Sequence, residues 1–133
     1  TQTLNIASSV NFLGHLNGEE KNKVIASNMA LVLPSKSENF GNVILEAFAQ
    51  GTPVIASKNT PWNILEEHNA GYWVEANANK LAEAMNSILN LESKKYKQTR
   101  ENAYNLCLSK FDIQSNIHVW ENYYQKITTD VYN

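Results

Sequence analysis

The chain has 133 residues, of which 43% are apolar, and its formal net charge at neutral pH is −2. This length suits one domain with a buried core, and the nearly balanced charge excludes a global basic field that would draw the chain to nucleic acid or anionic lipid. Its one cysteine, Cys107, excludes an intrachain disulfide and suits a reducing compartment. No apolar run is long enough to cross a bilayer, and the first residues do not resemble a signal peptide, so we expect neither a transmembrane helix nor a signal peptide in this sequence.

Strand-like and helix-like segments alternate from residue 10 to residue 91. Short apolar runs predict strands at Val10–Gly14, Ala30–Ser35, Pro53–Ser57 and Gly71–Glu75. Helices are expected after them at Glu19–Asn28, Asn42–Gln50, Trp62–His68 and Asn79–Leu91. Four βα units in this order predict an α/β fold, a Rossmann-like parallel sheet of about four strands with helices on both faces.

Residues 93–133 are expected to form two further helices. The first, Lys94–Lys110, carries a basic group made of Lys94, Lys95, Lys97 and Arg100. A solvated face is favoured over a membrane patch, because acidic residues at both ends dilute the charge. The same helix contains Cys107 between two leucines, which favours a small core residue over a nucleophile.

The last helix has an apolar stripe with spacings of four and three. Its members are Ile113, Ile117, Trp120, Tyr124, Ile127 and Val131. This spacing keeps all six on one face, which suits a core helix and a partner-binding helix equally well.

The most informative segment joins the predicted strand at Ala30–Ser35 to the next helix. Glu38 lies in the loop that follows the strand, and Gly41 and Asn42 open the helix, which Gly51 can end. Doubly wound folds bind ligands at this place, where a parallel strand ends and a helix begins.

Glu46 is the polar exception in an apolar helix. A carboxylate there must be paired or reach a polar cavity, because an unpaired buried charge is expensive. One carboxylate can accept hydrogen bonds from both hydroxyls of a ribose, and the free N–H groups of Asn42 and Val43 can face a phosphate. The alternatives are a structural carboxylate at Glu46, a surface carboxylate at Glu38 and an ordinary turn glycine at Gly41.

These motifs resemble the donor-binding domain of family 4 glycosyltransferases, which are retaining enzymes of the GT-B fold. The resemblance runs from about Val10 to about Leu89 and is carried by Glu-x7-Glu around Phe40-Gly41, followed by Gly51-Thr52-Pro53-Val54. Thr60-Pro61-Trp62 and Gly71-Tyr72-Trp73-Val74 resemble a subgroup of these enzymes.

The resemblance assigns roles to the loop and the helix start. It implies that Glu46 holds the nucleotide ribose and that Glu38 lies against the donor sugar, as the catalytic candidate. The predicted donor-binding set is Glu38, Asn39, Phe40, Gly41, Asn42, Val43 and Glu46. Lys58 and Thr60 follow another strand at the same sheet edge and are further candidates, and Trp62 can either cover a sugar ring or pack in a helix.

The resemblance also implies the activity of the whole protein. It predicts transfer of a hexose-type sugar, with retention, from a nucleotide-diphosphate sugar of the UDP or GDP type to a hydroxyl acceptor. Polysaccharide or glycolipid synthesis is the expected setting. We expect the protein to be located in the cytoplasm, with the cytoplasmic face of the membrane as an alternative. No cofactor is implied, and since His15, His68 and His118 lack metal-ligand spacing, no metal site is expected.

The chain lacks the family's Gly-Arg…Lys segment and Gly-x-Gly turn, as well as its acceptor-binding N-terminal domain. We therefore expect a partial domain, inactive alone, because nothing would stabilise charge on the leaving diphosphate. Two rivals stay open. A GT-B sugar-nucleotide epimerase would share the nucleotide, and a non-catalytic receiver-like domain would need an acidic cluster that the chain does not offer.

Overall fold

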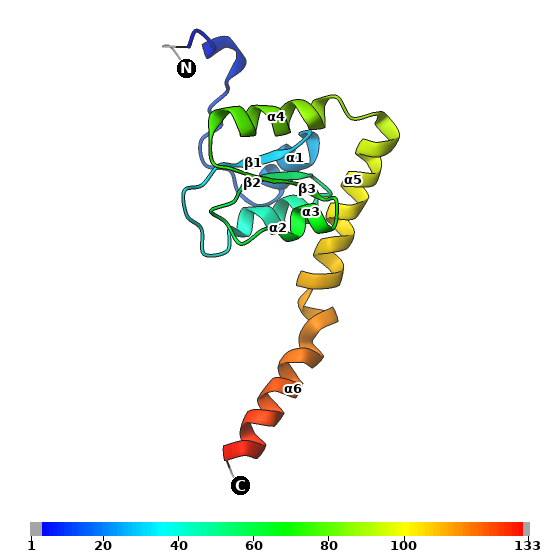
Figure 1. Cartoon of the computed structure of the whole chain (residues 1–133). Helices are drawn as coiled ribbons and strands as arrows, with labels where there is room; N and C mark the ends of the chain where they lie inside the picture. Colours follow the sequence, from blue (N-terminus) through cyan, green and yellow to red (C-terminus); the bar gives the residue numbers. More distant parts are fainter. Residues whose placement is uncertain (1–3, 132–133) are drawn as a thin grey trace.

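The computed structural model describes residues 4–131, and it forms a three-stranded parallel sheet with helices on both faces (Figure 1). Within that range the strands are β1 (Leu31–Leu33), β2 (Val54–Ser57) and β3 (Gly71–Val74). The α-helices are α1 (Gly18–Ser27), α2 (Asn42–Ala49), α3 (Ile64–Glu67), α4 (Ala78–Leu89), α5 (Ser93–Leu106) and α6 (Ile113–Val131). A short 3₁₀ helix, η1 (Ala7–Ser9), and a π-helix, η2 (Cys107–Phe111), complete the list. None of the helices described is long and apolar enough to span a membrane.

Strand β2 is the centre of the sheet, and all four of its residues are buried. Successive side chains of a strand point to opposite faces, so Val54 and Ala56 join one apolar cluster while Ile55 joins another. The first cluster includes residues of α1, α2, α3 and α5, and the second includes residues of α4. Figure 1 shows α4 on one side of the sheet, with α2 and α3 on the other. The predicted α/β class, with helices on both faces, is therefore confirmed.

The predicted strand at Val10–Gly14 is wrong. This segment has no regular secondary structure and pairs with no strand in the described part of the chain, and Phe12 and Leu13 are 85% and 57% exposed. A strand is stable only where a neighbour satisfies its N–H and C=O groups, and no strand of this sheet lies beside these residues. The sheet therefore has three strands where the sequence predicted about four.

The predicted helix at Lys94–Lys110 is divided, since α5 ends at Leu106 and η2 follows it. Lys94, Lys95 and Lys97 are exposed, as expected for a solvated face. Arg100 differs: its guanidinium donates to the Gln50 carbonyl at 3.1 Å and to the Ala26 carbonyl at 3.4 Å. Arg100 thus joins the C-terminal ends of α1 and α2 and does not belong to the exposed basic group.

Helix α6 leads away from the sheet (Figure 1). Four members of its predicted stripe, Ile113, Ile117, Trp120 and Tyr124, are at least 50% exposed. The side chains of Ile127 and Val131 lie outside the described part of the structure. These four side chains are too exposed to belong to the apolar core formed by the described residues, so for them the core-helix interpretation is wrong, and the partner-binding interpretation stays a prediction.

Candidate functional site

The loops that follow β1 and β2 are joined at the carboxyl edge of the sheet. The hydroxyl of Ser57, at the end of β2, donates to the carbonyl of Ser35. The hydroxyl of Ser35 in turn donates to Oε1 of Glu38 at 2.9 Å. These two hydrogen bonds orient the half-buried carboxylate of Glu38 at the sheet edge where the sequence predicted a ligand. Ser35 was missed as a contributor to the site, because a serine at a strand end carries no specific signal.

A cluster of aromatic rings supports the middle of the same loop. Trp62, only 1% exposed, donates its indole N–H to the carbonyl of Phe40, and the two ring centroids lie 5.1 Å apart. Phe111 of η2 lies 6.1 Å from the Phe40 ring, centroid to centroid. Because Trp62 is buried in these contacts, it is not available to cover a sugar ring, and the packing alternative for this residue is the correct one.

Gly41 is the residue on which the loop turns into α2. Its φ is +80°, a left-handed conformation that L side chains rarely adopt, and it occupies the N-cap position of the helix. A Cβ there would lie 3.3 Å from Cδ2 of Leu33. The left-handed conformation therefore favours glycine, and an added Cβ would also require Leu33 to shift by a few tenths of an ångström. The amide groups of Asn42 and Val43 follow in the first turn, where N–H groups have no partner within the helix.

Glu46 lies one helical turn after Asn42 and is paired. Its Oε1 lies 2.6 Å from Nζ of Lys21, which comes from α1, and each side chain is 36% exposed. The sequence-based requirement that this carboxylate be paired or reach a polar cavity is thus met by a lysine 25 residues earlier. Lys21 was missed as a site residue, because nothing in the sequence indicates that α1 packs against α2.

Lys58 and Thr60 lie in the loop after β2, and both side chains make contacts with other residues of the chain. The Lys58 ammonium is 3.3 Å from Oε1 of Glu75 and lies over the Trp73 ring, 5.8 Å from its centroid. Thr60 is 3% exposed, and its hydroxyl donates to the Ser57 carbonyl at 2.6 Å. Their role as ligand contacts stays a prediction.

The loop around Glu38 and the first turns of α2 therefore form a compact arrangement at the sheet edge. It offers an oriented carboxylate, free N–H groups at a helix start and a second carboxylate one turn further on. Such an arrangement can bind an anion at the helix start and hydroxyl groups at the two carboxylates. No group of three or more His, Cys, Asp or Glu suited to a metal ion occurs within residues 4–131.

The fold is that of a GT-B glycosyltransferase domain. A sucrose-phosphate synthase from Thermosynechococcus elongatus superposes with a TM-score of 0.84 at 27% identity, over 97% of this chain and 33% of that chain. Anabaena HepE, solved in complex with UDP, superposes with a TM-score of 0.78 at 25% identity, over 93% of this chain and 34% of that chain.

The sequence comparison defines the family. The chain belongs to the glycosyl transferases group 1 family, whose model matches residues 1–106. It is 40% identical to the uncharacterized glycosyltransferase MJ1607 of Methanocaldococcus jannaschii over 72 residues, which are 53% of this chain and 18% of that protein. It is 45% identical to the sulfoquinovosyl transferase SQD2 of Arabidopsis thaliana over 47 residues, 35% of this chain and 9% of that protein. The match thus spans less than a fifth of either relative.

Proposed function

We propose that this chain is the donor-binding part of a retaining, family 4 glycosyltransferase. The complete protein transfers a hexose-type sugar from a nucleotide-diphosphate sugar to a hydroxyl acceptor, without a metal ion. An acceptor saccharide or glycolipid, polysaccharide or glycolipid synthesis, and a cytoplasmic location that includes the membrane face belong to the same proposal.

The observation that carries the proposal is the placement of Glu38 and Glu46 on either side of the α2 N-terminus. Glu38 precedes the helix, in the loop that Ser35 orients, and Glu46 lies one turn inside it. A nucleotide-diphosphate sugar presents its groups in the same order, with the ribose at one end, the diphosphate in the middle and the donor sugar at the other end. HepE, a structural neighbour, was solved in complex with UDP and glucose, which supports a nucleotide-sugar donor.

Each part of the arrangement has one role in this proposal. Glu46 accepts hydrogen bonds from the ribose hydroxyls, and the amides from Phe40 to Val43 donate to the diphosphate and sugar. Glu38 orients the donor sugar and stabilises positive charge that develops on it in the transition state.

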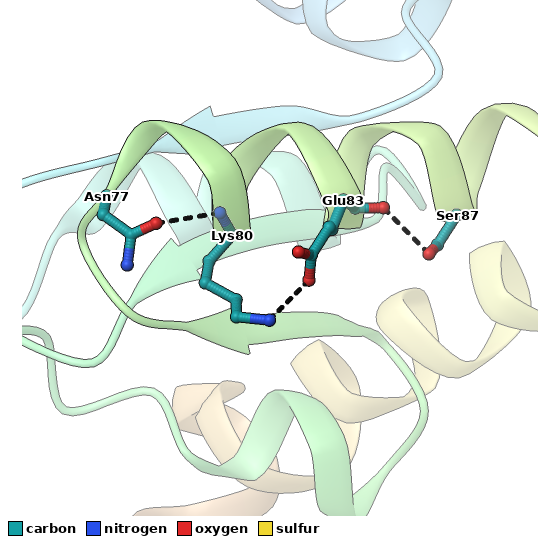
Figure 2. A network of polar contacts seen from close by, with 4 residues as sticks. All are labelled: Asn77, Lys80, Glu83 and Ser87. Carbon is teal, nitrogen blue, oxygen red and sulfur yellow. Dashed lines mark hydrogen bonds and ion pairs between the residues drawn. The ribbon is translucent and has the colours of Figure 1, made fainter.

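Titration of the chain with uridine diphosphate and guanosine diphosphate tests the proposal. Glu46→Ala should weaken binding of the preferred nucleotide by roughly tenfold or more, because a charged acceptor of two hydrogen bonds is lost. The matched control is Glu83→Ala, which removes another carboxylate paired with a lysine at 2.6 Å. Glu83 lies on α4, on the opposite face of the sheet, within a local network of Asn77, Lys80 and Ser87 (Figure 2).

Equal affinities of Glu46→Ala and the unmodified chain would contradict the ribose role. Binding of neither diphosphate by the unmodified chain would contradict the proposed donor site as a whole. Unchanged binding by Glu83→Ala is the result expected of the control, since that pair lies in the other helical layer.

A further inference from the structure

The ion pair between Lys21 and Glu46 leaves one carboxylate oxygen unoccupied. Oε1 of Glu46 takes the Lys21 ammonium, and within residues 4–131 its Oε2 has no partner. Lys21 is also the cation that joins α1 to a helix whose other residues from Val43 to Ala49 are apolar. The pair therefore limits the positions that the Glu46 side chain can adopt.

The pair contributes little to the stability of the fold. Both side chains are 36% exposed, and ion pairs with such exposure are weakened by solvent screening and by the entropy cost of ordering two long side chains. A variant without the Lys21 ammonium should therefore fold, and its main consequence should be a freer Glu46 carboxylate.

The position of the carboxylate relative to the helix start follows from helix geometry. Glu46 is four residues after Asn42 and so lies on the same face of α2, about 6 Å further along the axis. Lys21 approaches this face from α1, which packs against α2 through the apolar cluster that contains Ile25 and Ile44. A ligand group held at Glu46 would therefore lie beside α1.

We propose that Lys21 is a positioning residue for the ribose of the bound nucleotide. It holds Oε1 of Glu46, so that Oε2 is presented to the ribose hydroxyls in a fixed direction. The inference rests on the proposed function, because it requires Glu46 to bind ribose. Lys21 acts through Glu46, so its effect depends on the two hydroxyls and not on the diphosphate.

The test compares uridine diphosphate with its 2′,3′-dideoxy analogue, and the guanosine pair is run in parallel. The measured quantity is the affinity for the natural nucleotide divided by the affinity for its dideoxy analogue. This ratio isolates the contribution of the ribose hydroxyls. Lys21→Ala should lower this ratio by about fivefold, in the range of couplings between contacting groups. In a Glu46→Ala background, Lys21→Ala should cause no further change in the ratio.

Lys23→Ala is the matched control. Lys23 lies on the same helix, and its removal changes the net charge equally, but its partner is Glu19 at 3.8 Å and it is 80% exposed. The ratio should not change in this variant. Any loss of affinity that comes from charge alone affects both nucleotides equally and cancels in the ratio.

The outcomes separate the inference from the proposed function. A lower ratio in Lys21→Ala alone supports the positioning role. An unchanged ratio in Lys21→Ala, with a lower ratio in Glu46→Ala, overturns the role of Lys21 and keeps the ribose site. An unchanged ratio in Glu46→Ala, or no nucleotide binding by the unmodified chain, overturns the proposed function and this inference with it.

Discussion

The indole N–H of Trp62 donates to the backbone carbonyl of Phe40, and this bond joins the loop after β2 to the loop after β1. The two rings also pack against one another, and Phe48 of α2 lies 5.7 Å from the Trp62 ring, centroid to centroid. Trp62 thereby supports the backbone from which the amides of the candidate site project.

Replacement of Trp62 by Phe should keep an aromatic ring but lose the hydrogen bond and part of the buried volume. We expect the free energy of unfolding to fall by about 1–3 kcal/mol, measured by urea denaturation. Trp120→Phe is the control, since Trp120 is 58% exposed and should be replaced without measurable cost. An unaltered urea midpoint for the Trp62 variant would show that the bond does not stabilise the loop.

Gly41→Ala should destabilise the chain for two reasons. The left-handed φ costs an L residue roughly 1–2 kcal/mol, and the new Cβ would press on Leu33. Gly14→Ala separates the two effects, because Gly14 has a φ of +70° but no atom within 4 Å of an added Cβ. Thermal melting should therefore show a larger loss for the Gly41 variant. Equal losses would mean that the contact with Leu33 costs nothing.

Glu38→Gln tests the role of the first carboxylate in recognition of the donor sugar. If the proposed donor site is correct, we expect the affinity for the preferred nucleoside diphosphate to stay the same and the affinity for its hexose derivative to fall by roughly tenfold, because a charged acceptor to the sugar is lost. Calorimetry with both ligands measures the difference. Glu66→Gln, an exposed carboxylate on α3, is the control. A similar loss for both ligands would place Glu38 at the diphosphate instead of the sugar.

Cys107 should be a slowly reacting thiol. Burial raises the pKa of the Cys107 thiol, and the negative charge of Asp112 raises it further. Because the thiolate is the reactive form, alkylation by iodoacetamide should accelerate only at higher pH than for free cysteine. Asp112→Asn should move the pH profile of the alkylation rate downward, and unfolding in urea should restore the rate of an ordinary thiol. A profile identical to that of free cysteine in the folded chain would contradict this interpretation.

The strands and helices between residues 30 and 91 could be predicted to within about two residues at each end, because apolar runs alternate with amphipathic segments and clear turn residues. The predicted strand at Val10–Gly14 shows where this reasoning stops. Its apolar residues satisfy the local pattern, but a strand also needs a neighbouring strand, and the sequence does not say which segments become neighbours.

The residues of the candidate site also fall into two groups, those that the sequence could identify and those that only the structure reveals. Glu38, Gly41 and Glu46 could be identified from one continuous segment, because the strand, the turn and the helix start are local features. Lys21 contributes from an element distant in sequence, so only the packing of α1 on α2 brings it to the site. The end of β2 could be placed at this sheet edge from the sequence, but only the parallel register of β1 on β2 decides that the Ser57 hydroxyl reaches the Ser35 carbonyl.

The sequence by itself determined the α/β class, the position of the candidate loop after β1 and the residue types in it, because these depend on short-range periodicity and on side-chain chemistry. The tertiary structure alone decided that Glu46 pairs with Lys21, that Trp62 is a buried support and that the Val10–Gly14 segment remains unpaired. Such contacts depend on which elements pack together, and that choice reflects the burial of apolar area over the whole chain rather than any local pattern.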